Sequence, residues 1–340
     1  VSGPMPGEGI AYLVPWDGLG SARFLTHLHD QGLSVRVMVR PITAMVRGED
    51  HRFAAGTLVV PMRQRSTAGR SASEVVSEIA TETGVRIHVS ESGLTRTGPD
   101  LGGPSSRVLT PRRVALLTGR GTSSTRTGEM WHFLSERLGL AVSLLDLGRL
   151  PDVDLSRYDV IVIAGGAPPD SALLGLEPWL RGGGTLVGAG SAVDDVASAG
   201  LVELQTRDLD VDSLTAGAPW IDRRAARGAH VVGGAILEIE LDATHPMSFG
   251  IGSSLPVFRS TSTLFEPEGG GIVGRYTDAP LLSGYVSEAR LALVPGSPAI
   301  VVRDLDRGRV ILIVDEPVFR GFWLGSARLM SNAVLLSSLM

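Results

Sequence analysis

The stretch YDVIVIAGGAPPDSALLGLEPWLRGGGTLVGAGSAVDDV, residues 158–196, decides the fold. It contains two short, continuous apolar runs, Val160–Ala164 and Thr185–Gly188, and an apolar helical face at Leu173–Leu180 lies between them. Continuous apolar runs of this length are typical of strands that are covered on both faces. The stretch therefore predicts a parallel βαβ unit, and with it an α/β fold.

Strands and helices alternate on both sides of this unit. Upstream, the pattern predicts strands at 9–14, 34–39, 56–60, 85–89, 113–117 and 141–145, and helices at 21–31, 72–83 and 129–138. Downstream, it predicts strands at 231–241 and 272–276 around a loop at 245–256, a hairpin at 299–314 and a last helix at 324–336. This order predicts a doubly wound, mostly parallel, flavodoxin-like sheet with a smaller N-terminal α/β unit. A stretch rich in Gly, Pro, Ser and Thr, residues 95–112, predicts a linker, and we place the boundary near residue 108.

The composition excludes several classes of function. The 340 residues are 43% hydrophobic and 20% charged, as expected for a globular protein with a large core, and the formal net charge is −5. No basic run favours nucleic acid, and no apolar run is long enough to span a membrane. The chain lacks cysteine and lysine, which excludes thiolate zinc sites, cysteine nucleophiles, a Walker A loop and Schiff-base chemistry.

A ligand crevice is expected at the carboxyl ends of the parallel strands. One candidate is the loop 119–128, where Gly119, Gly121 and Ser123 precede a helix whose N-terminus could hold an anion. The pattern favours the simpler interpretation, a tight turn with a hydroxyl cap. Gly165, Gly166, Gly188, His245 and Glu316 complete the set of candidate ligand-binding residues.

Histidines and carboxylates supply the other candidates. His27 and His29 project about 200° apart on a helix, so they cannot share a metal. His245 is a candidate acid or base, although a structural role in an ordered loop is favoured. Asp315 and Glu316 could bind a divalent cation or act as acid and base. We favour a helix cap and a contact to Arg320, because consecutive residues at a strand end point in opposite directions.

The segment FRGFW combines a large apolar area with one cation. It supplies a candidate interface of four side chains, which are Phe319, Arg320, Phe322 and Trp323. A core anchor for the last helix and a docking surface for a neighbouring domain are both open interpretations.

The central stretch resembles class I glutamine amidotransferase-like domains. Gly165-Gly166 matches the turn of that family, Val187-Gly188-Ala189-Gly190 matches the strand-to-helix elbow, and Asp315-Glu316-Pro317 matches the segment that carries the base. The resemblance implies that Gly188 occupies the place of the nucleophile and Asp315 the place of the base. Both catalytic roles would then be lost.

Taken whole, the chain resembles the region that follows the catalytic domain in bacterial zinc-carboxypeptidase-like proteins of the M14 class. The matching landmarks are Gly56–Pro61, Thr97–Gly102, Arg113–Gly119, Tyr158–Gly166, His245-Pro246, Leu282–Tyr285 and Glu316–Trp323. The resemblance implies a small unit with a linker at 1–108 and an amidotransferase-like domain at 109–340. It implies zinc only in an upstream peptidase domain and no metal or cofactor in this chain. It also implies a secreted or periplasmic location, and the chain, which begins at Val1, is expected to be a piece of a larger protein.

Three hypotheses follow. The first is a non-catalytic accessory domain that packs on the peptidase domain of the same or a companion chain. The second is a free-standing protein that binds a small molecule in the crevice. The third is a metal-dependent hydrolase that uses Asp315, Glu316 and His245.

Overall fold

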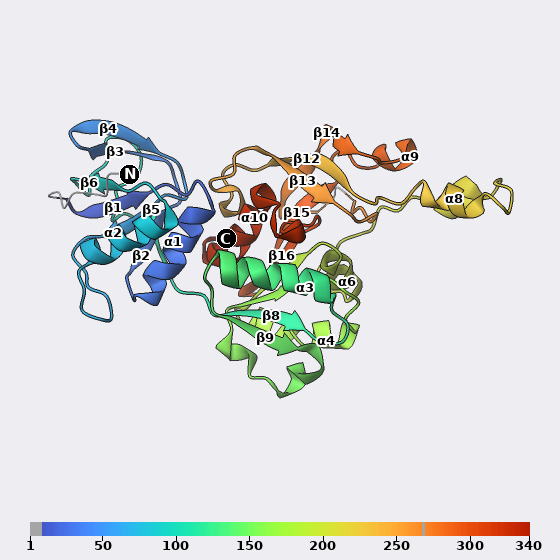
Figure 1. Ribbon diagram of the computed structural model, residues 1–340, viewed down its shortest axis with the longest axis horizontal. Helices are drawn as coiled ribbons and strands as arrows, with labels where there is room; N and C mark the ends of the chain where they lie inside the picture. Colours follow the sequence, from blue (N-terminus) through green and yellow to red (C-terminus); the bar gives the residue numbers. More distant parts are fainter. Residues whose placement is uncertain (1–8, 267–268) are drawn as a thin grey trace.

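The computed structural model describes residues 9–266 and 269–340. Two units lie side by side, one on a five-stranded sheet and one on a nine-stranded sheet (Figure 1). The elements of the first unit are β1 (Ala11–Val14), α1 (Leu19–Asp30), β2 (Val35–Met38), β3 (Ile42–Val46), β4 (Glu49–Phe53), β5 (Leu58–Pro61), α2 (Ala72–Thr83), β6 (His88–Ser90) and β7 (Ser106–Leu109).

The smaller sheet is antiparallel throughout, in the order β6-β1-β5-β2-β7, and β3 and β4 form a separate hairpin. Helix α2 begins with a capping box between Ser71 and Glu74 and ends at Gly84, which has the left-handed conformation. The predicted linker at 95–112 is partly wrong, since β7 lies within it and pairs with β2. This strand forms because its backbone hydrogen-bonds to β2, and the local sequence contains no strand pattern that predicts it.

The second unit begins with β8 (Val114–Thr118). Its other elements are α3 (Ser124–Trp131), η1 (His132–Arg137), β9 (Val142–Asp146), η2 (Leu147–Asp152), η3 (Leu155–Arg157), β10 (Val160–Ile163), α4 (Asp170–Leu174), α5 (Glu177–Arg181), β11 (Thr185–Ala189), α6 (Ala192–Ser198), α7 (Val211–Thr215), α8 (Arg223–Gly228), β12 (Ala235–Leu241), η4 (Pro246–Ser248), β13 (Ser254–Arg259), β14 (Ile272–Gly284), α9 (Glu288–Leu291), β15 (Pro298–Leu305), β16 (Gly308–Ile313), η5 (Phe319–Gly321), α10 (Leu324–Leu335) and η6 (Ser337–Leu339).

The nine-stranded sheet confirms the predicted fold class. Strands β9-β8-β10-β11-β16 are parallel neighbours, which in chain order is the 2-1-3-4-5 arrangement of flavodoxin-like folds. Four antiparallel strands, β15, β14, β12 and β13, then extend the sheet beyond β16. The loop predicted at 245–256 is partly wrong, since its last residues belong to β13. This segment forms a strand at the edge of the sheet because it pairs with β12.

The predicted βαβ unit is present, and β10 pairs with β11 from Val160–Thr185 to Ile163–Gly188. Its helix is divided into α4 and α5, contrary to the single helix expected at 173–180. Pro178 explains the break, since it has no N–H to donate and therefore stands in the first turn of α5.

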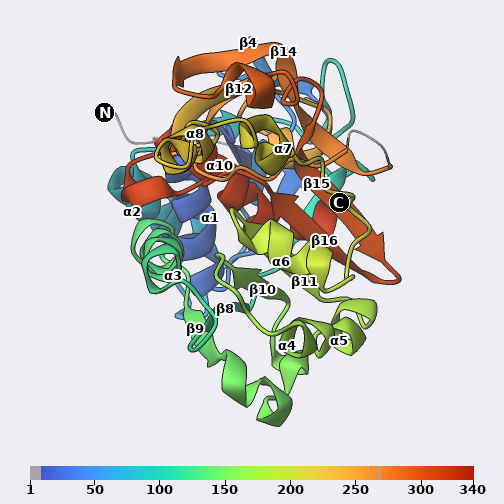
Figure 2. The same cartoon turned by 90° about the vertical axis from the view of Figure 1, so that its right-hand side faces the viewer.

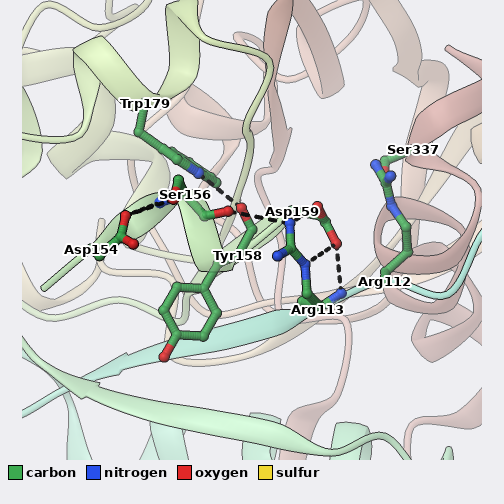
Figure 3. Close-up of polar contacts among 8 residues, drawn as sticks. All are labelled: Arg112, Arg113, Asp154, Ser156, Tyr158, Asp159, Trp179 and Ser337. Carbon is green, nitrogen blue, oxygen red and sulfur yellow. Dashed lines mark hydrogen bonds and ion pairs between the residues drawn. The ribbon is translucent and has the colours of Figure 1, made fainter.

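A bidentate ion pair fixes the amino ends of β8 and β10 (Figure 3). The guanidinium and the backbone N–H of Arg113 donate to Asp159, with N···O distances of 2.7–3.0 Å. Beside it, the Trp179 indole N–H donates to the Tyr158 carbonyl at 3.0 Å, which ties α5 to the start of β10.

Helices cover both faces of the parallel strands. On one face, α4, α5 and α6 bury leucine and valine side chains such as Leu173, Leu180 and Val193 against β10 and β11. On the other face, α3 and α10 pack on the sheet, and the same hydrophobic cluster continues into α1 and α2 of the first unit. Because the two units share this core, the domain boundary near residue 108 stays a prediction.

The Asn332 side chain joins the two units. Its Oδ1 accepts from the Trp16 indole N–H at 2.8 Å, and its Nδ2 donates to the Met247 and Phe249 carbonyls at 2.8 and 3.0 Å. All three bonds are buried. They connect the end of β1, the segment around η4 and helix α10, three parts that are far apart in the sequence.

We predict that Asn332→Ala lowers the free energy of unfolding by about 3–5 kcal/mol, because one N–H and two carbonyl groups would lose buried partners. Trp16→Phe removes only one of the bonds and should cost about 1–2 kcal/mol. Urea denaturation measures both. Equal losses for the two variants would contradict the central role of the amide.

Candidate functional site

The carboxyl ends of β8, β10, β11 and β16 meet at one edge of the sheet, where a doubly wound fold places its ligand crevice. Each strand is followed there by a candidate segment from the sequence. These segments are the loop after β8, the turn at Gly165-Gly166, the elbow after β11, and Asp315-Glu316 after β16.

The two glycine loops close on each other. Ser123 N donates to Gly165 O at 2.9 Å, and Ala167 N donates to Gly121 O at 2.9 Å. A side chain on Gly166 would collide with the Gly121 carbonyl. The amide groups of Ser123 and Ala167 are therefore occupied by the protein's own backbone.

The rest of the loop is also structural. The Ser123 hydroxyl accepts from Arg126 N and caps α3, and Asp146 lies against Gly119, where its charge would repel an anion. The capped-turn interpretation thus fits this loop better than the anion site. The glycines predicted to hold a ligand instead allow two loops to approach closely.

The elbow turns at Gly190, two residues beyond the position we predicted. Gly188 is buried within β11, and a Cβ there would lie 2.9 Å from the Leu312 side chain. Gly190 has φ +60°, the left-handed conformation that a strained strand-to-helix turn imposes on its central residue. A Cβ on Gly190 would lie 3.0 Å from Glu316 Oε1. If the chain had a nucleophile, its position would be 190 and its neighbour would be Glu316.

Glu316 is held by Arg126 of α3. The distance from Arg126 Nη2 to Glu316 Oε1 is 3.0 Å, and the Ser260 hydroxyl donates to the same oxygen at 3.2 Å. The other guanidinium nitrogen lies 3.3 Å from Glu129 Oε2, and both carboxylates are largely buried. Burial raises the pKa of Glu316, while the charge of Arg126 opposes the rise.

Asp315 points the other way, into a fully buried cluster with Arg259 and Tyr276. Arg259 Nη1 donates to Asp315 Oδ1 at 3.3 Å, and the Tyr276 hydroxyl donates to Oδ2 at 2.7 Å. Arg259 also donates to the Tyr276 oxygen at 2.6 Å and to the Thr263 carbonyl. Burial raises the pKa of Asp315, against the attraction of Arg259. Both oxygens of this carboxylate are already used.

The opposite directions of Asp315 and Glu316 agree with the sequence argument, but the predicted contact to Arg320 is wrong. The partners are Arg259 and Arg126. The Arg320 side chain, within η5, is exposed, and its backbone N–H donates to Glu129 Oε1 at 3.1 Å. Helix α3 supplies Arg126 and strand β13 supplies Arg259, and both elements extend to this edge of the sheet.

His245 does not belong to this edge. Its Nδ1 accepts from Met247 N at 3.2 Å and caps η4, and burial lowers its pKa. Asp242 and Arg309 are the charges that act on it, and Arg309 is the second residue of β16, the strand whose far end leads to Asp315. At about 3.3 Å per residue, these ends of β16 lie roughly 20 Å apart. The third hypothesis therefore loses its acid-base pair.

Among residues 9–266 and 269–340, no group of three or more His, Asp or Glu side chains could hold a metal ion. In the same part of the chain, no helix is long and apolar enough to cross a membrane. His29 donates to the Leu109 carbonyl at 3.1 Å and His27 faces Glu82 at 3.5 Å, so these two imidazoles point apart as expected.

The FRGFW segment lines an open groove. Phe319 stacks on Phe258 at 3.9 Å between ring centroids, and Trp323 lies 6.0 Å from the same ring. The groove has a volume of about 230 Å³, and its other walls come from β12 and from the end of β14. Phe322 is 60% exposed, so this cluster is not a closed core.

Sequence reasoning missed Arg126, Arg259 and Tyr276, which hold the two carboxylates. A fully buried arginine is rare, yet the sequence does not distinguish Arg259 from the other arginines of the chain. The sequence signal that could have placed the elbow was Gly190, the last glycine before the helix, because glycine is the residue that most readily adopts the left-handed conformation of such a turn.

No family model matches the chain, and no curated protein matches it. Solved structures that resemble it include a protein described as part of a GMP synthase from Thermoplasma acidophilum, with 9% identity and a TM-score of 0.44 over 67% of this chain and 96% of that one. PurLQS from Thermotoga maritima shows 14% identity and a TM-score of 0.43 over 67% of this chain and 99% of that one. A ThuA-like protein from Bacteroides uniformis shows 15% identity and a TM-score of 0.40 over 68% and 94%. These likenesses carry no argument about activity, and the fold class stands on the strand order.

We predict that Arg126→Met lowers the free energy of unfolding by about 2 kcal/mol at pH 7, because Glu316 would stay buried without its cation. The loss should shrink as the pH falls towards 4.5, the usual pKa of a glutamate, since protonation removes the unpaired charge. Urea denaturation at pH 4.5 and 7 measures this. The control, Arg126→Met with Glu316→Leu, should lose less, and a loss that does not depend on pH would contradict the assignment.

Asp195 provides a second pH test. Burial raises its pKa to about 6, with Asp194 and Asp170 adding to the effect, and among the described residues no group hydrogen-bonds its Oδ2. Between pH 3.8, the ordinary pKa of an aspartate, and about 6, this carboxyl binds a proton in the folded chain but not in the unfolded chain. The free energy of unfolding therefore falls as the pH rises through that range. Discounted for its exposure, Asp195→Asn should gain about 1 kcal/mol at pH 7 and almost nothing near pH 4. A gain of equal size at both pH values would exclude this cause.

Proposed function

We propose that this chain is a non-catalytic accessory domain of an M14-like zinc metallocarboxypeptidase. The observation that supports it is the elbow, where Gly190 stands at the turn and the neighbouring Glu316 is neutralised by Arg126. Acyl transfer by the amidotransferase mechanism needs a nucleophile and an adjacent base. At this edge of the sheet the chain supplies an ion pair in place of both.

The geometry gives less support to the two alternatives. The two glycine loops of the small-ligand hypothesis hydrogen-bond to each other, because Ser123 N and Ala167 N donate to the Gly165 and Gly121 carbonyls, so these two amide groups are not free for a ligand. The residues of the hydrolase hypothesis lie in three separate environments.

The proposed partner is the peptidase domain of the same or a companion chain, and zinc would be bound there. A secreted or periplasmic location belongs to the same proposal. Both rest on the resemblance of landmarks such as Glu316–Trp323 and His245-Pro246 to the M14 class.

A cysteine at the elbow tests the loss of catalysis. We expect that neither Gly190→Cys nor Gly188→Cys releases ammonia from glutamine, because no imidazole replaces the missing base and Glu316 would disfavour a thiolate at position 190. The measurement is ammonia release by the purified variants, with the unchanged protein as the control. Turnover by either variant would refute the proposal for this edge of the sheet.

The accessory role is tested in the source cells. An antibody against this chain should detect a species much heavier than 35.8 kDa, or a stable complex with a peptidase. A free species of that mass without a peptidase partner would argue against the role.

A further inference from the structure

The segment 208–229, which carries α7 and α8, extends away from both sheets (Figure 1). Both of its ends are fixed to the body of the molecule. Arg207 N donates to the Leu264 carbonyl at 2.7 Å, and at the other end Arg290 donates to the His230 carbonyl at 2.8 Å. Between these two contacts the chain leaves the packed core and returns to it.

Little tertiary packing holds this segment in its conformation. Thr215 is its only buried residue, and Trp220 is 79% exposed. Its two helices have five and six residues, a length that is marginal without tertiary packing. An ion pair joins them, from Arg227 Nη2 to Asp212 Oδ1 at 2.9 Å, but both side chains are mostly exposed. Because exposed ion pairs add little stability, the segment opens at a low cost in free energy.

The segment also contains two consecutive arginines, Arg223 and Arg224, at the start of α8. Both side chains are exposed, and so is Ala225, the next residue. An endoprotease with a carboxylate in its specificity pocket, such as trypsin, selects arginine on the amino side of the bond that it cuts. Exposed segments with few buried contacts are the preferred sites of such cuts. The bond between Arg224 and Ala225 meets both conditions.

The sequence contains one other pair of this kind, Arg112-Arg113, and the fold protects it. The Arg113 carbonyl accepts from Asp159 N at 2.9 Å and from Val160 N at 3.2 Å, and the residue that follows, Val114, is buried in β8. Figure 3 shows the Arg113 side chain held by Asp159 as well. A cut after Arg113 would require β8 to leave its place between β9 and β10. The same two residues are therefore protected at one position and accessible at the other.

We propose that the segment 208–229 is a processing site, where an arginine-specific serine endoprotease hydrolyses the bond between Arg224 and Ala225. One water molecule is consumed. Its oxygen joins the Arg224 carbonyl carbon, the C–N bond breaks, and both hydrogens go to the departing nitrogen. The products are a carboxylate at Arg224 and an ammonium group at Ala225. This inference goes beyond the accessory role and does not depend on it.

The cleaved chain remains one folded molecule. The cut separates residues 1–224 from residues 225–340, but β11 of the first fragment pairs with β16 of the second inside the large sheet. The buried hydrogen bond from Trp16 to Asn332 also joins the two fragments. Neither contact involves the segment 208–229. Hydrolysis therefore frees two ends on the surface and leaves the body intact.

Limited digestion with trypsin tests the site. Because the chain lacks lysine, trypsin can cut only after arginine. We expect the first cut of the full chain in native buffer to fall within residues 223–228, identified by the intact masses of the fragments, while the bond after Arg113 survives. The two fragments should elute together from a size-exclusion column and separate only in denaturant. A first cut in the body, or fragments that separate without denaturant, would overturn the proposal.

A variant without arginine in α8 provides the next test. Changing Arg223, Arg224 and Arg227 together to Gln should slow the first cut at least about tenfold, because the remaining arginine bonds lie outside this segment and open less readily. Arg157→Gln is the matched control, since Arg157 is also exposed but lies in η3 of the body, and it should leave the rate unchanged. Circular dichroism should show that both variants are folded. An unchanged rate for the triple variant would exclude this segment as the first site.

The chain isolated from its source cells tests whether processing takes place there. Amino-terminal sequencing of this material should find a second terminus at Ala225. If the cells contain only the uncut chain, and trypsin still cuts it within residues 223–228, the segment is exposed but is not a processing site, and the proposal is wrong.

Discussion

The structure depends on the buried hydrogen bonds of the Asn332 side chain. One amide group satisfies an indole N–H from the end of β1 and two carbonyl groups around η4, and none of these groups can reach water. Because an unpaired buried polar group costs more than a hydrogen bond gains, the three segments can pack only together. Close approach of the backbone allows this geometry, since a side chain on Gly250 would collide with the Trp16 carbonyl. The two sheets are consequently parts of one core.

The same requirement explains the carboxyl edge of the large sheet. Two consecutive carboxylates leave β16 in opposite directions, and each is buried beside its own arginine. A buried charge without a partner would be strongly unfavourable, so Arg126 and Arg259 are needed wherever Glu316 and Asp315 are buried. Doubly wound folds bind their ligands at this edge of the sheet, but side chains decide what such an edge does. In this chain they form ion pairs that hold α3, β13 and β16 together.

Stability is distributed unevenly over the molecule. The parallel strands are covered by helices on both faces (Figure 2). The segment 208–229, in contrast, is held at its two ends and exposes its apolar residues. Segments with few buried contacts open most easily, and interaction surfaces are often drawn from them.

The sequence by itself determined the α/β class, the parallel pair β10–β11 and the late hairpin, because these follow from local apolar periodicity and turn residues. It also determined that Asp315 and Glu316 would diverge, since alternation along a strand is a local property. Only the tertiary structure decided that β7 and β13 are strands, that Gly190 is the turn, and that Arg126 and Arg259 are the partners of the two carboxylates. Edge strands and ion pairs depend on contacts with residues that are distant in the chain, and the local sequence does not distinguish one arginine from another. The sequence shows which charged groups are present, and tertiary packing determines which of them form ion pairs.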